Sequence, residues 1–145
     1  MTSAPRMAAA SGRTTVQWVS LVFGLGFILV AVLGFIASGT SMEADPNLAP
    51  RALGMFPVNL LHNCVHLAFG LWGIAAARTH DAARAYCRIA GVIYLVLTAL
   101  GYFSPNGFGL VPLGGPDVLL HLVLGLVLAG VGFTAKDTRA LPASR

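Results

Sequence analysis

Two apolar segments of this chain each carry a pair of ionisable residues one helical turn apart. The first pair is His62 and His66, and the second is Asp117 and His121. Residues at positions i and i+4 of a helix share one face, with their Cβ atoms about 6 Å apart. Three imidazoles and one carboxylate form a ligand set that suits Zn²⁺. His62, His66, Asp117 and His121 are therefore candidate metal ligands, provided that the two segments lie side by side, although the sequence favours an interpretation without a cofactor.

The same residues allow three other interpretations. His66 and His121 on two helices of a bundle could be the axial ligands of a b-type haem, with Gly70 and Gly125 leaving room for the macrocycle. Ionisable residues inside a membrane are also candidates for proton or quinone chemistry. With no cofactor, Asp117 would cap the start of its helix and the histidines would hydrogen-bond the backbone of the outer loops. The sequence shows no nucleophile, base and acid in a catalytic order, so we predict no catalytic residue.

The composition places these residues in a membrane. Hydrophobic residues make up 57% of the 145 residues and charged residues only 10%, with a mean hydropathy of +0.80. A soluble domain of this size needs a largely polar surface. Four apolar spans, 16–37, 57–77, 85–103 and 116–134, would form helices of about 28–33 Å, close to the thickness of the hydrocarbon layer. We predict an all-α membrane protein, a four-helix up-down-up-down bundle in which the short link 78–81 makes the second and third helices neighbours.

The charged residues predict an orientation. Eight of the nine basic residues fall on one side of the four spans, and only Arg51 falls on the other, with Glu43, Asp45 and Asp117. An excess of Lys and Arg marks the cytoplasmic side, so both termini should be cytoplasmic in a multi-pass protein of the plasma membrane. Residues 1–14 are expected to be a disordered tail and 136–145 a short polar tail. No basic face with stacking aromatic residues is present, which excludes nucleic acid as a partner.

The chain also repeats itself. The sequence Phe56-Pro57 with His66 and Gly70 recurs as Val111-Pro112 with His121 and Gly125, at an offset of 55 positions, and an upstream pattern recurs at an offset of 67, from Gly24 and Phe27 to Gly91 and Tyr94. We interpret the chain as two tandem helical hairpins of the same orientation. In this alignment His62 corresponds to Asp117, and His66 to His121.

The string FPVN-x-x-HN-x-x-H at residues 56–66, followed by the Gly-rich segment 109–115, resembles a family of small four-pass membrane proteins that is common in actinobacteria and catalogued as a domain of unknown function. The resemblance covers about residues 16–134. It implies an integral membrane protein with four helices, and it carries no activity. We accordingly expect a structural or partner-binding module in contact with the lipid bilayer, whose partner would be a second copy or another membrane protein. The alternative is a metal- or haem-binding component that handles electrons or protons through the His/Asp cluster.

Overall fold

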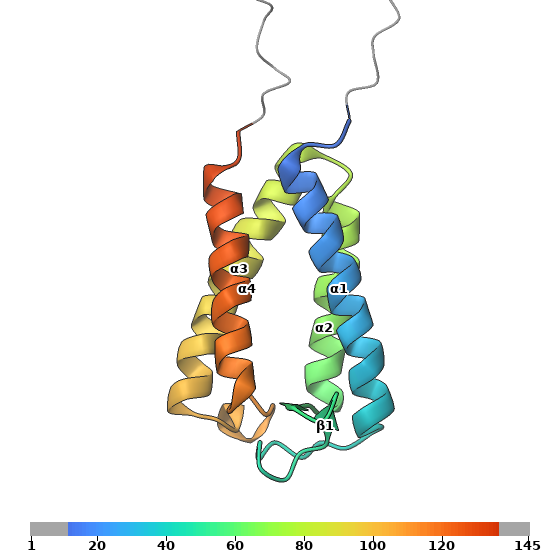
Figure 1. Ribbon diagram of the computed structural model, residues 1–145, viewed down its shortest axis with the longest axis vertical. Helices are drawn as coiled ribbons and strands as arrows, with labels where there is room; N and C mark the ends of the chain where they lie inside the picture. The colour runs from blue at the N-terminus through green and yellow to red at the C-terminus, as the bar shows by residue number, and fades with distance from the viewer. Residues whose placement is uncertain (1–11, 137–145) are drawn as a thin grey trace, which may run out of the picture.

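A computed structural model describes residues 12–136 as four helices with a small strand pair (Figure 1). The helices and strands, in chain order, are α1 (Thr15–Ser38), β1 (Arg51–Ala52), β2 (Phe56–Pro57), α2 (Leu60–Ala76), α3 (His80–Phe103), the 3-10 helix η1 (Gly107–Gly109) and α4 (Pro116–Thr134). The strands are antiparallel, with Arg51 opposite Pro57 and Ala52 opposite Phe56. Of the two predicted tails, residues 1–11 and 137–145 lie outside the described residues.

Three helices, α1, α3 and α4, are long and apolar enough to cross a membrane, and α2 is a shorter apolar helix of 17 residues. Their outward side chains are large and apolar, as a lipid environment allows. Ile36 is 77% exposed and Phe103 is 82% exposed. Surfaces of this kind are costly in water, so these apolar helices suggest contact with the lipid bilayer.

Two helices begin at different residues from those predicted. The second predicted span began at 57, but Phe56 and Pro57 belong to β2 and α2 begins at Leu60, after the N-cap Asn59. The third predicted span began at 85, whereas α3 begins at His80 because the side chain of Thr79 caps the backbone N–H of Ala82 at 3.2 Å. In both cases a capping residue, and not the first apolar residue, sets the start of the helix.

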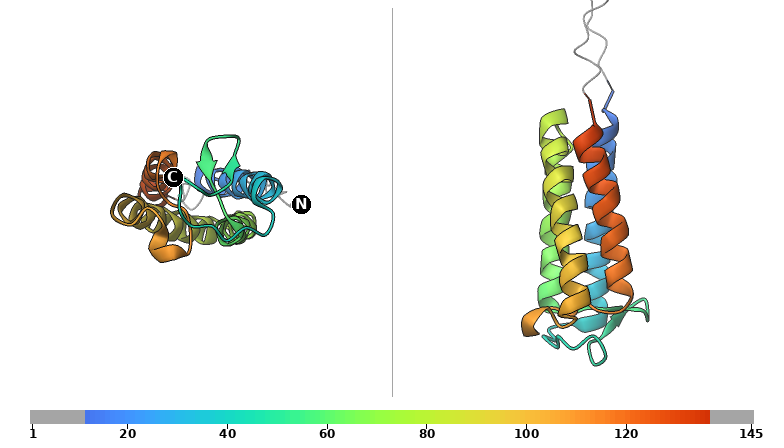
Figure 2. Two further views of the ribbon diagram at one scale, coloured as in Figure 1. Left: turned by 90° about the horizontal axis from the view of Figure 1, so that it is seen from below. Right: turned by 90° about the vertical axis from the view of Figure 1, so that its left-hand side faces the viewer.

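The helices pack as two antiparallel pairs, α1 with α2 and α3 with α4 (Figures 1 and 2). The pairs approach each other at the end that holds both termini and separate toward the loop end. α3 packs mainly against α4, and its contact with α2 is slight, although a turn of only three residues joins α2 to α3. The short link therefore does not make α2 and α3 close packing partners. Each helix packs mainly against the other helix of its own pair.

The hydrophobic core lies toward the terminal end, where the two pairs meet. Phe27 of α1 stacks on Tyr94 of α3, with ring centroids 5.3 Å apart, and so joins one pair to the other. Close to this end, Ser20 donates a hydrogen bond to the carbonyl of Gly73 at 2.7 Å. The buried core residues are Val16, Phe27, Ala76, Ala83, Tyr86, Cys87, Ala90, Tyr94 and Leu128. The loop end is left to polar side chains.

Candidate metal site

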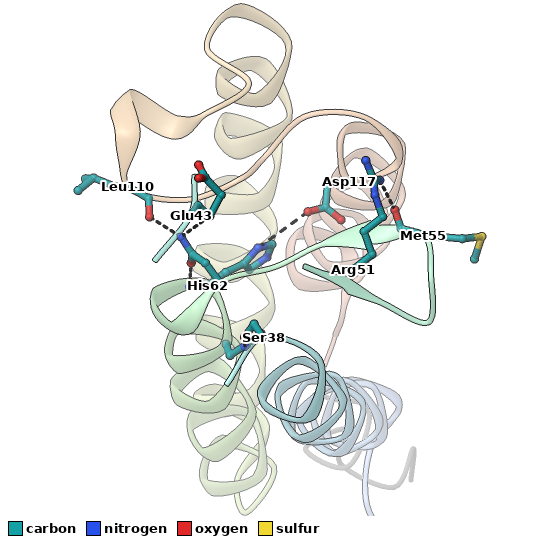
Figure 3. A network of polar contacts seen from close by, with 9 residues as sticks. Ser38, Glu43, Arg51, Met55, His62, Leu110 and Asp117 are labelled. Carbon is teal, nitrogen blue, oxygen red and sulfur yellow. Dashed lines mark hydrogen bonds and ion pairs between the residues drawn. The ribbon is translucent and has the colours of Figure 1, made fainter. Parts of the chain in front are cut away.

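The starts of α2 and α4 bring three ionisable side chains together at the loop end. His62 and Asp117 lie in the first turns of these helices, and His121 lies one turn further along α4. Nδ1 of His62 is 3.9 Å from Oδ2 of Asp117, and Figure 3 shows the two side chains pointing toward each other. One ligand atom from each of His62, Asp117 and His121 lies within 4.8 Å of the others. We call these three residues the His/Asp triad.

His66, the fourth predicted ligand, lies beside the triad. Its ring stacks on that of His62, with centroids 4.7 Å apart and planes 19° apart. On another side its ring is 5.6 Å from that of Phe27. His66 lies one turn after His62 on α2, and its side chain therefore faces α1 more than that of His62 does. The structure brings three of the four predicted ligands into one cluster and places the fourth against it.

The triad is buried and poorly satisfied. His62 is 5% exposed, and Asp117 and His121 are each 2% exposed. Nδ1 of both histidines and Oδ2 of the carboxylate have no hydrogen-bond partner among residues 12–136. A buried polar atom without a partner costs about 1–3 kcal/mol, and such atoms in native proteins often mark a ligand. In the interpretation without a cofactor the histidines hydrogen-bond the loop backbone. Loop carbonyls do lie near the ring of His62, but Nδ1 of neither histidine has a partner within residues 12–136.

Asn59 positions the first of these ligands. Its side-chain oxygen accepts a hydrogen bond from the backbone N–H of His62 at 2.9 Å. Its side-chain nitrogen donates to the carbonyl of Leu110 at 2.8 Å and to that of Glu43 at 3.3 Å. Asn59 is fully buried, and it joins the start of α2 to both outer loops. The position of Asn59 carries a signal in the sequence, because an Asn directly before an apolar helix is typical of an N-cap.

Backbone carbonyls complete the surroundings of His62. Those of Pro57 and Pro112 lie near its ring, and Nδ1 has no hydrogen-bond partner among residues 12–136. A carbonyl that accepts the proton of one ring nitrogen would leave the other free to bind a metal.

The geometry gives less support to haem. A cavity of about 80 Å³ lies next to His66 and His121, whereas small-molecule and cofactor pockets usually measure about 300–1,000 Å³. The expectation that Gly70 and Gly125 leave room for a macrocycle is wrong. A Cβ on Gly70 would lie 2.6 Å from Cγ1 of Ile28, and one on Gly125 would lie 2.9 Å from Leu95. Both glycines allow two helices to approach closely, so axial ligation by His66 and His121 stays a prediction without support from the cavity.

Fold and site together define a class: an apolar four-helix protein with a buried His/Asp cluster at one end. The chain belongs to the family described as a domain of unknown function (DUF4383), whose profile matches residues 17–134. This match confirms that the resemblance seen in the sequence leads to a family of unknown function, and it covers all but the ends of the helical region. The actinobacterial distribution and the diagnostic value of the motif stay predictions. No curated protein and no solved structure matches the chain.

Proposed function

We propose that the chain is a multi-pass plasma-membrane protein that binds a divalent transition metal ion, Zn²⁺ in the first instance, through His62, Asp117 and His121. The observation that carries the proposal is the His/Asp triad: three buried residues from two helices, each with one ligand atom within 4.8 Å of the others and each with a buried polar atom that has no partner among residues 12–136. A metal ion would satisfy all three atoms at once, which explains why polar groups are kept where each is costly.

The ligand atoms of the triad would need to move only slightly to bind a metal ion. Zn²⁺ bonds of about 2.0–2.2 Å place tetrahedral ligand atoms about 3.3 Å apart. The 3.9 Å between His62 and Asp117 is near this value, and modest side-chain rotation would bring in His121. Three protein ligands leave one coordination position open, as in sites where the metal acts on a bound molecule. Two histidines and one carboxylate also suit Fe²⁺, so the metal is best identified by elemental analysis.

Metal binding is tested on the full chain purified in detergent. We expect the purified protein to carry close to one equivalent of metal by elemental analysis, and the chelator-treated protein to bind Co²⁺ with a visible absorption band. The variants His121→Ala and Asp117→Asn should weaken Co²⁺ binding by about 100-fold, because a lost ligand costs at least as much as a lost outer-shell partner. His80→Gln is the control, because His80 lies at the other end of the bundle, with Nδ1 3.1 Å from Oγ1 of Thr14.

His66→Phe separates the competing interpretations, because phenylalanine keeps the stacking on His62 without a ligand atom. A site made by the triad should retain its Co²⁺ affinity in this variant. A large loss would support the four-ligand set, and a Soret band that disappears in the variant would support haem. A preparation that is free of metal and binds neither Zn²⁺ nor Co²⁺ would overturn the proposal and leave the structural or partner-binding module, which the sequence favoured.

The proposed orientation puts the triad in the outer half of the membrane, because both termini are cytoplasmic in this arrangement. We expect a fluorescent protein fused after Arg145 to fluoresce in the cytoplasm. Alkaline phosphatase inserted at Asn47, in the loop between α1 and β1, should be active outside the membrane. If alkaline phosphatase fused at the C-terminus were active instead, the orientation would be opposite to the proposed one. The site would then have access to cytoplasmic metal.

The proposal also includes the internal duplication. Corresponding glycines make corresponding contacts in the two helix pairs. A Cβ on Gly70 would meet Ile28, and a Cβ on Gly125 would meet Leu95. Ile28 and Leu95 are themselves 67 positions apart, the offset found upstream in the sequence. These matching contacts support two copies of one hairpin, from each of which the triad takes at least one ligand.

A further inference from the structure

Residues of α1 and α4 line an apolar groove. The β1–β2 hairpin, which lies beside the ends of these helices in Figure 2 (left), covers its outer part. The groove consists of two cavities. The outer one, of about 210 Å³, lies under Ala52 and Phe56 of the hairpin, and the inner one, of about 260 Å³, continues along the two helices. Val30, His66 and Leu120 line both cavities, so the two adjoin. We call this space the α1–α4 groove.

The groove opens to the lipid through α1. Val22 is 59% exposed and Gly26 is also exposed, and both line the inner cavity. A Cβ built on Gly26 would meet no atom within 4 Å, in contrast to Gly24, whose Cβ would lie 2.7 Å from the backbone nitrogen of Ile74 in α2. Gly26 is therefore not needed for helix packing, and its missing side chain leaves the groove open.

A polar group lies where the two cavities adjoin. Nδ1 of His66 has no hydrogen-bond partner within the described part of the chain, and His66 is 5% exposed. A neutral imidazole carries one donor and one acceptor, so it can bind an oxygen atom of a ligand. None of the described residues that line the groove is Lys or Arg, which disfavours a phosphate or carboxylate head group, and Asp117 in the outer cavity would repel one.

The walls of the groove specify the rest of the ligand. The rings of Phe27, Phe56 and His62 lie around the head position, which favours a flat ring. The inner cavity is a single path between helices, lined by Val22, Val30 and Leu124 among others, and it suits one apolar chain. From these observations we propose that the α1–α4 groove binds a quinone with an isoprenoid tail, with its ring oxygen at His66 and its tail along α1 and α4.

This inference does not rest on the metal proposal. His66 lies outside the triad, and Gly26 is on α1, which carries no residue of the triad. The test uses the full chain in lipid nanodiscs, treated with chelator, and a photoreactive azidobenzoquinone that carries a ten-carbon chain. After illumination, mass spectrometry should place the label on α1 and α4 beside the groove. Unlabelled decyl benzoquinone should compete with the label, and decanol should not.

Gly26→Leu fills the groove and should lower labelling at least fivefold. Gly130→Leu is the matched control, because Gly130 is also a helical glycine with no atom within 4 Å of an added Cβ and does not line the groove. His66→Phe should reduce labelling about 2–10-fold, the effect of one lost hydrogen bond. If Gly26→Leu elutes as an aggregate, Val30→Trp blocks the segment shared by both cavities instead.

Labelling that is equal in Gly26→Leu, Val30→Trp and the parent protein would overturn the proposal. Competition by decanol that matches that of the quinone would also overturn it, since the groove would then hold only an alkyl chain of the bilayer. Loss of labelling in His121→Ala with unchanged labelling in Gly26→Leu would place the quinone in the separate cavity beside His121 and would also overturn the proposal.

Discussion

Replacing Asn59 by aspartate should lower the free energy of unfolding by about 3 kcal/mol. Aspartate keeps the side-chain oxygen that caps His62, but it removes both hydrogen bonds that the amide nitrogen donates to Leu110 and Glu43. Each buried carbonyl that loses its donor costs about 1–3 kcal/mol. The carboxylate oxygen that takes the place of the amide would also face these two carbonyls. Equilibrium unfolding in mixed detergent micelles measures the loss.

Thr79→Ala serves as the control for Asn59→Asp. Thr79 also caps a helix, but its bond to Ala82 is exposed and it holds no loop, so the change should cost about 1 kcal/mol or less. The two variants should also differ at the metal site. Asn59→Asp frees the start of α2 and should weaken Co²⁺ binding, whereas Thr79→Ala should not affect it. A loss in Asn59→Asp no larger than that in Thr79→Ala would mean that the two hydrogen bonds of the Asn59 amide do not hold the outer loops.

The existence of the four helices could be predicted because an apolar run of about 20 residues has few alternatives in a membrane. Their starts were harder to predict. Phe56 and Pro57 are as apolar as the helix that follows, but they pair with Arg51 and Ala52. Two-residue strands of this kind are set by tertiary hydrogen bonds. The guanidinium group of Arg51 holds this turn in place. It donates hydrogen bonds to the carbonyls of Met55 and Pro46 at 3.1 and 3.0 Å. No periodic pattern in the sequence predicts such contacts.

The candidate site could likewise be predicted only in part. The spacing of His62, His66, Asp117 and His121 predicted two facing pairs, and three of the residues do meet. Four residues advance a helix by about 400°, so each i+4 step turns the side chain by about 40°. Along α2 this rotation carries His66 from α4 toward Phe27 of α1. Which residue of a pair meets the other helix depends on how each helix is rotated about its axis, and spacing alone does not contain that information.

The glycines were the least predictable part. Gly70 and Gly125 were expected to leave space, yet they are closely covered by neighbouring helices, whereas Gly26 leaves its space empty. A glycine inside an apolar span looks the same in both situations. The difference lies in the partner helix, because small residues permit close contact only where another backbone is present to make it.

The second large effect should follow from Gly91→Leu in α3. A Cβ at Gly91 would collide with the backbone and side chain of Ala129 in α4, and a backbone cannot move aside as the end of a flexible side chain can. Overpacking usually costs about 1–3 kcal/mol and occasionally more, and we expect Gly91→Leu to exceed 3 kcal/mol. Gly130→Leu should change the free energy of unfolding little or increase it slightly, since leucine favours helix more than glycine by up to about 1 kcal/mol.

The same experiment tests the duplication in energetic terms. Gly24 of α1 corresponds to Gly91 and lies against the backbone of Gly70 and Ile74 in α2. If the two hairpins are copies that pack alike, Gly24→Leu and Gly91→Leu should cost similar free energies of unfolding. Only Gly91→Leu should displace α4 from α3 and so move Asp117 and His121 together, while Gly24→Leu displaces α2 and moves His62. Either variant would therefore separate the triad, and Co²⁺ binding should fall in both. A stable Gly91→Leu protein with unchanged Co²⁺ affinity would show that the contact between α3 and α4 does not position the site.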